Sequence, residues 1–92
     1  MIHDFNHKGL EKLFEAGISS GVTQKNVTRL RRILALLETA ETLDDMNLPG
    51  LKLHELKGKQ KGTWSVQVTG NWRMTFKLHE GDVFEVNYED YH

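Results

Sequence analysis

The apolar residues in the first half of the chain recur at the spacing of helices. One helix is expected over residues 7–16, with Asn6 as its N-cap and Gly17 as its stop. A second helix is expected to run from Thr23, its N-cap, to about Thr39. The apolar faces consist of Leu10, Leu13 and Phe14 in the first helix, and of Val27, Leu30, Ile33, Leu34 and Leu37 in the second.

After Pro49-Gly50 the apolar spacing changes to every second residue, which is typical of strands buried on one face. Short strands are expected over residues 2–5 and 51–56. Three further strands follow, separated by turn signals at Gly70-Asn71 and Glu80-Gly81. The residues expected to face the core are Trp64, Val66 and Val68, then Trp72, Met74, Phe76 and Leu78, and finally Phe84, Val86 and Tyr88.

These elements predict an α+β fold, in which two N-terminal helices pack on one face of a mostly antiparallel sheet. The opposite, polar face of the sheet is then left without helices. Such a face is usually solvated, and it becomes a site only where titratable groups converge on it. The side chains expected there are Ser65, Gln67, Arg73, Thr75, Lys77, Glu85 and Asn87.

Composition places the chain among globular proteins and excludes several kinds of chemistry. With 92 residues, 38% apolar and 27% charged, it has room for one core. The absence of cysteine excludes disulfides and thiol chemistry. Neither a signal pattern nor an apolar run of membrane-spanning length is visible, so a cytoplasmic protein without membrane contact is expected.

The net charge of −1 hides alternating blocks of charge. Residues 24–37 carry +4 and residues 38–51 carry −4, whereas residues 52–77 carry +5 and residues 78–92 carry −5. Such blocks either pair with one another or leave a local positive surface that binds phosphates. Charge alone leaves both interpretations open.

The last three residues, Asp90, Tyr91 and His92, directly follow a predicted strand. They combine a proton acceptor, an aromatic ring and an imidazole that titrates near neutral pH. Tyr91 is suited to stack on or hydrogen-bond an extruded base. Asp90 is suited to orient an imidazole or to act as the base itself.

Three residues upstream complete a set that suits RNA cleavage without a metal. His54 and His92 could form a proton-transfer pair, while Lys57 and Arg73 would hold the phosphate and stabilise its extra charge in the transition state. Each residue alone has an ordinary structural interpretation: a hydrogen-bonded histidine, a salt-bridged arginine or an edge aromatic. Only their convergence would indicate an activity.

No metal or cofactor is expected. His3 and His7 lie four residues apart, but they straddle a predicted boundary between strand and helix. His79, Glu80 and Asp82 lie in a turn without further ligands nearby in the sequence. The glycine-rich, nucleophile-elbow and DNA-reading motifs that carry other functions are not found.

The chain resembles the HigB toxins of the RelE/ParE superfamily, which belong to bacterial toxin–antitoxin modules. The resemblance spans residues 1–92 and rests on the motifs at 52–58 (Lys-Leu-His-Glu-Leu-Lys-Gly), 64–66 (Trp-Ser-Val), 71–76 (Asn-Trp-Arg-Met-Thr-Phe) and 87–92 (Asn-Tyr-Glu-Asp-Tyr-His). It implies a single domain with the RelE-like microbial RNase fold.

The same resemblance implies a ribosome-dependent mRNA interferase that cuts the codon in the ribosomal A site without a metal ion. It also implies neutralisation by a HigA-type helix-turn-helix antitoxin, with operator DNA contacted only through that antitoxin. The positions that match the family's active site are His54, Lys57, Arg73, Asp90, Tyr91 and His92.

Two other functions remain open at this stage. ParE-like members of the superfamily target gyrase, but they are expected to lack the set formed by His54, Arg73 and His92. A non-catalytic module that only binds an antitoxin would be compatible with the same sequence.

Overall fold

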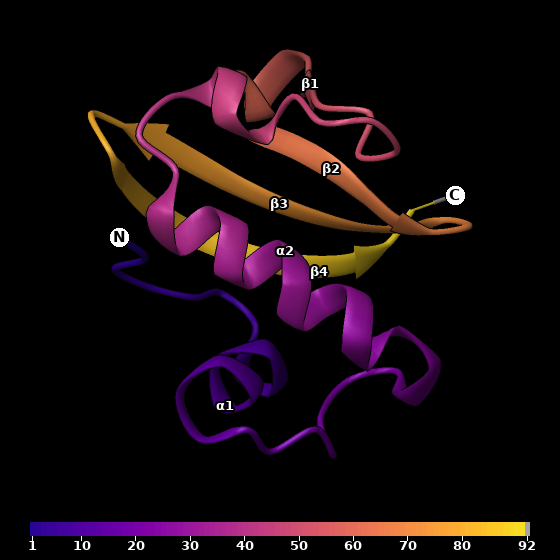
Figure 1. Cartoon of the computed structure of the whole chain (residues 1–92). Helices are drawn as coiled ribbons and strands as arrows, with labels where there is room; N and C mark the ends of the chain where they lie inside the picture. Colours follow the sequence, from indigo (N-terminus) through magenta and orange to yellow (C-terminus); the bar gives the residue numbers. More distant parts are fainter. Residues whose placement is uncertain (92) are drawn as a thin grey trace.

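The computed structural model describes residues 1–91 and shows two helices packed against one face of a four-stranded antiparallel sheet (Figure 1). The strands follow one another in the order β1-β2-β3-β4. The predicted α+β class is therefore confirmed. The helices are α1 (Lys8–Ala16) and α2 (Val27–Thr39), the strands are β1 (His54–Glu55), β2 (Trp64–Thr69), β3 (Trp72–His79) and β4 (Asp82–Asp90), and short 3₁₀ helices cover Gln24–Asn26, Leu43–Met46 and Gly58–Gln60.

Helix α1 begins one residue later than expected, because His7 and not Asn6 is its N-cap. The ring Nδ1 of His7 accepts a hydrogen bond from the backbone N–H of Leu10 at 3.0 Å. Burial of the ring lowers the pKa of His7, and the neutral ring keeps the lone pair that the cap requires. The expected stop is confirmed, since Gly17 ends the helix with a φ of 70°.

Helix α2 starts later than the pattern predicts and ends where it predicts. Thr23 precedes the 3₁₀ turn Gln24–Asn26, and α2 itself runs from Val27 to Thr39. In Figure 1 this helix crosses the sheet, with α1 beside it. No helix in the part of the chain that the structure describes is long and apolar enough to cross a membrane.

The hydrophobic core lies between the two helices and the sheet. Both helices and the three longer strands supply side chains with almost no exposed surface. Burying each of them contributes about 1.5–3 kcal/mol to folding. These side chains include Leu10, Leu30, Ile33, Leu34, Leu37, Val66, Met74, Phe76, Val83 and Val86.

A buried polar group ties the start of α2 to strands β2 and β4. Asn26 is fully buried, and its amide Nδ2 donates to the hydroxyl of Tyr88 at 2.7 Å. The hydroxyl of Thr69 donates in turn to the side-chain oxygen of Asn26 at 2.6 Å. The ring of Tyr88 stacks on Trp72 with 4.5 Å between centroids. These contacts join α2 to the end of the sheet where the candidate residues lie.

Strand β4 contains a bulge that the sequence pattern does not reveal. Glu85 has a left-handed φ of 54°, and the pairing with β3 shifts by one residue after the pair Lys77–Phe84. A shift of one residue exchanges the two faces of a strand. The prediction that Phe84 faces the core is therefore wrong: Val83 is buried there, and Phe84 stacks on His3 with 4.9 Å between ring centroids.

The N-terminal segment lies along the outer edge of β4. Isolated parallel bridges join Ile2 to Val83 and Phe5 to Val86, so the strand expected at 2–5 forms only in part. Backbone hydrogen bonds of 2.8 Å from His3 and Asn6 reinforce this contact. The segment covers an edge that would otherwise be open to pairing with other chains.

The polar face of the sheet is less solvated than expected. Ser65 and Thr75, which pair across β2 and β3, are only 1% and 4% exposed. The strand expected at 51–56 is reduced to β1, in which His54 pairs with Ser65. Leu56 follows β1 and is buried at 7% exposure, although it does not belong to the main core. The centre of the polar face, at Ser65 and Thr75, is therefore buried. The hollows on this face lie around that buried centre.

Candidate active site

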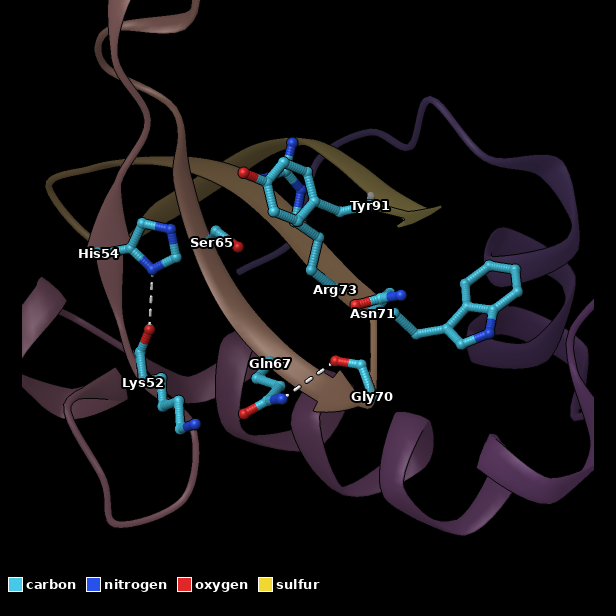
Figure 2. Close-up of a pocket in the computed structure, with 9 residues that line it drawn as sticks. Lys52, His54, Ser65, Gln67, Gly70, Asn71, Arg73 and Tyr91 are labelled. Carbon is cyan, nitrogen blue, oxygen red and sulfur yellow. Dashed lines mark hydrogen bonds between the residues drawn. The ribbon is translucent and has the colours of Figure 1, made fainter.

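Two hollows on the polar face share His54, Arg73 and Tyr91 in their walls. Figure 2 shows the first, which has a volume of about 260 Å³ and is also lined by Lys52, Ser65, Gln67, Gly70, Asn71 and Trp72. The second has a volume of about 350 Å³, and its wall adds Glu55, Leu56, Lys57 and Gln60. Four of the six predicted residues, His54, Lys57, Arg73 and Tyr91, therefore lie around one pair of hollows.

Arg73 is held by a carboxylate from the neighbouring strand. The register of β3 and β4 places Arg73 opposite Glu89, and Nε and Nη2 of Arg73 donate to the same oxygen of Glu89 at 3.0 and 2.7 Å. The Arg73 side chain is 13% exposed and that of Glu89 is 32% exposed. The structural interpretation of Arg73, a salt-bridged arginine, is therefore confirmed, and the same side chain also lines both hollows, where its functional role stays a prediction.

Tyr91 lies over the Arg73 guanidinium. The central carbon of that group is 4.2 Å from the ring centroid, within the range of a cation–π contact. The backbone N–H of Tyr91 donates to the carbonyl of Asn71 at 2.6 Å, which fixes the end of β4 to the turn between β2 and β3. The residue remains 57% exposed, so ring surface stays available for stacking on a base.

The hydrogen bond made by His54 assigns its tautomer. Its Nδ1 lies 3.0 Å from the carbonyl oxygen of Lys52, as the dashed line in Figure 2 shows. A carbonyl only accepts, so Nδ1 carries the hydrogen, and Nε2 of the neutral ring bears a lone pair. The exposed ring is therefore oriented to take a proton through Nε2.

The remaining predicted residues have a weaker connection to the two hollows, or none that the structure describes. Lys57 is exposed, precedes the turn Gly58–Gln60 and lines only the second hollow. Asp90 is the last residue of β4, pairs with Trp72 and lines neither hollow. His92 lies outside the described residues. Within residues 1–91, no three side chains of the metal-binding types gather closely enough to hold an ion.

Sequence reasoning missed several residues of this site. Glu89 was counted only within an acidic block, although it pairs with Arg73. Gln67 and Asn71 line the first hollow, where the amide of Gln67 donates to the carbonyl of Gly70 at 3.1 Å. The alternation of the strands puts Gln67 beside Arg73 on the polar face, and this pattern could have identified Gln67 as a residue of the site. The alternation that puts Glu85 and Asn87 on the polar face continues to Glu89, but the pairing of Glu89 with Arg73 depends on the bulge in β4.

The profile of a protein family described as "RelE-like toxin of type II toxin-antitoxin system HigB" matches residues 3–92. The chain belongs to this family of HigB toxins. A curated relative, the endoribonuclease HigB of Proteus vulgaris, is 47% identical over 92 residues, which is 100% of both chains. The resemblance inferred from the motifs is thus confirmed. As a HigB toxin of a type II module, the protein has an antitoxin as its partner.

Proposed function

We propose that this HigB toxin is a ribosome-dependent mRNA interferase, an endoribonuclease that cuts mRNA in the A site of the translating ribosome. The observation that carries the proposal is the convergence of a proton-accepting His54, a fixed guanidinium and an exposed aromatic ring on one open face. The name of the Proteus vulgaris relative, an endoribonuclease, supports the same activity.

In the proposed mechanism, Nε2 of His54 takes the proton of the ribose 2′-hydroxyl, and the resulting oxygen attacks the adjacent phosphate. The bond from phosphorus to the 5′-oxygen breaks, and this leaving oxygen receives a proton. We assign that proton to His92, with Asp90 orienting an imidazole. No metal ion is needed in this scheme, because each proton has a side chain to take or supply it.

Arg73 and Lys57 stabilise the charge that develops on the phosphate. The bonds to Glu89 use Nε and Nη2 of Arg73, so Nη1 is the guanidinium nitrogen left for a phosphate within the described structure. Tyr91 stacks on a base of the bound codon through the ring surface that Arg73 does not cover.

We assign neutralisation to a HigA-type helix-turn-helix antitoxin, through which the toxin would contact operator DNA. The site of action is the cytoplasm, where translating ribosomes are found. The few basic groups around the hollows suit a target that the ribosome itself positions, since ribosomal RNA then supplies much of the binding energy.

Expression of the toxin without its antitoxin tests the proposal. We expect growth arrest and cuts within translated mRNA, mapped by primer extension, and both effects should disappear with H54A. The matched control is H79A, which removes an exposed histidine that lines neither hollow.

Three other results would contradict the proposal. Cleavage of naked and translated RNA at equal rates would exclude ribosome dependence. DNA breaks with intact mRNA would identify a gyrase-targeting toxin. Antitoxin binding without arrest or cleavage would identify a non-catalytic module.

A further inference from the structure

We infer that Glu89 is a positioning residue that aims the Arg73 guanidinium at the substrate phosphate and limits its affinity for RNA outside the ribosome. The inference rests on the proposed function, because its effect is measured in RNA binding and cleavage. It concerns the half-buried carboxylate of Glu89, which lines neither hollow but bonds Arg73, and which also accepts a hydrogen bond from Asn87 at 3.5 Å.

The geometry around Arg73 indicates the aiming role. Glu89 binds the edge of the guanidinium formed by Nε and Nη2, and Tyr91 covers one of its faces. The carboxylate belongs to the strand beside Arg73 and is held opposite it by the register of the sheet. A planar guanidinium fixed along one edge and one face presents its remaining edge in a single direction. Such preorganisation makes an interaction available in the transition state without reordering the side chain.

The charge of Glu89 indicates the second role. Arg73 is only 13% exposed, so water screens it weakly and the carboxylate 2.7 Å away largely offsets its positive charge. Binding of single-stranded RNA becomes tighter and more dependent on salt with each additional phosphate that a cation neutralises. The pair Arg73–Glu89 therefore gives a site that orients a phosphate already delivered to it, but attracts free RNA weakly.

A second ion pair on the same two strands provides a matched control. Lys77 and Glu85 approach to 2.9 Å, and their side chains are 48% and 47% exposed. Neither residue lines the two hollows. The substitution E85Q removes the same charge from the same face of the sheet without touching Arg73.

The experiment compares E89Q and E89A with E85Q and the wild type. Cleavage by each protein is measured on ribosomes programmed with a defined codon, to give kcat and KM, and binding of a short naked RNA is measured across a salt series. We expect E89A to lower kcat about tenfold, because the guanidinium of Arg73 loses its fixed orientation. The same substitution should tighten the binding of naked RNA about threefold and make that binding more dependent on salt. E89Q keeps an acceptor oxygen, so its kcat should fall less while its RNA binding tightens equally.

A purely structural role would give a different result, because a damaged site lowers cleavage and RNA binding together. That outcome would overturn the inference. It would also be overturned if kcat and naked-RNA affinity in E89A and E89Q lay within twofold of those in E85Q, or if either variant had a kcat above that of the wild type. Thermal unfolding of each variant is measured as a control, so that only variants that are folded at the assay temperature are compared. If the wild type itself cleaves no RNA on programmed ribosomes, the proposed function fails, and the role of Glu89 fails with it. Normal wild-type cleavage with unchanged Glu89 variants refutes only the role of Glu89.

Discussion

A similar trio of side chains meets near each end of strand β4. Near its start, His3 bonds Asp82 at 2.7 Å and stacks on Phe84. Near its end, Arg73 bonds Glu89 at 2.7 Å and lies over the ring of Tyr91. Each trio combines a basic group, a carboxylate and an aromatic ring. Residue types alone therefore do not separate an anchor from a site.

The two trios differ in burial and in what surrounds them. His3 and Asp82 are 37% and 47% exposed and line none of the hollows found at the site, and their bond secures the N-terminal segment against β4. Arg73 is much less exposed and faces two hollows together with His54. A basic group becomes useful for chemistry where screening by water is weak and a substrate has room beside it.

The largest expected effect is on Arg73. R73A should lower cleavage about 10²- to 10³-fold, because the charge that develops on the phosphate loses its partner. R73K should recover little of this loss, since an ammonium neither lies flat under Tyr91 nor binds Glu89 through two nitrogens. Rates on programmed ribosomes give the measurement, and H3A is the control from the other trio. A similar loss in H3A would erase the proposed difference between the trios.

His54 should follow in size of effect. H54Q should lower cleavage about 10²-fold or more and remove the limb of the pH–rate profile that reports the base. H3Q should leave the profile unchanged, although its histidine is also held by a hydrogen bond. The profile of each variant between pH 5 and pH 9 decides the point. A profile that keeps both limbs in H54Q would show that another group is the base.

Tyr91 allows the aromatic rings of the trios to be compared. Y91A should raise KM about 10- to 100-fold through lost stacking on a base, whereas Y91F should remain close to the wild type. F84A should leave KM unchanged and lower only thermal stability, because its ring stacks on His3 and lines neither hollow. If Y91F is as impaired as Y91A, the hydroxyl and not the ring surface is what matters.

The smallest effect concerns the pH dependence of stability at the first trio. The hydrogen bond from His3 lowers the pKa of Asp82 below its ordinary value of 3.8. A lowered carboxyl pKa stabilises the folded state above the ordinary value, and this contribution is lost as pH falls through the folded pKa. The stability difference between the wild type and D82N should therefore be present at pH 6 and shrink below pH 4. Thermal melts across this range provide the test, and a difference that stays constant with pH would contradict it.

Much of the fold was predictable because it depends on local patterns. Helical and strand periods located both helices and the three longer strands, and Gly17 marked a helix end through its left-handed conformation. The N-cap was missed because histidine is an uncommon cap, and it acts as one here only while burial keeps the ring neutral. The start of α2 was also missed, since a 3₁₀ turn has much the same local sequence as a first helical turn.

The site was predictable where side chains follow strand alternation, and it was not where a contact depends on register. Arg73 was expected on the polar face and Tyr91 in the same site, and the two side chains do lie together. The partner of Arg73 could not be read from the sequence, because nothing in the run from Val83 to Asn87 marks Glu85 as a bulge residue. Glutamate at a positive φ is uncommon, and the surrounding sheet imposes that conformation.

The bulge at Glu85 also determines how the gene can change length. Without the bulge, the pairing at Lys77–Phe84 would continue so that Arg73 faced Tyr88, and the core and polar positions at the end of β4 would be exchanged. Deletion of Glu85 itself leaves one residue between Phe84 and Asn87, so the pairs on both sides of the bulge persist and the C-terminal side chains keep their faces. Deletion of one residue from the regular stretch that begins at Tyr88 has no extra residue to compensate for it, and it turns the side chains that follow to the other face. Loss of one residue should accordingly be tolerated at Glu85 and eliminated a few positions later.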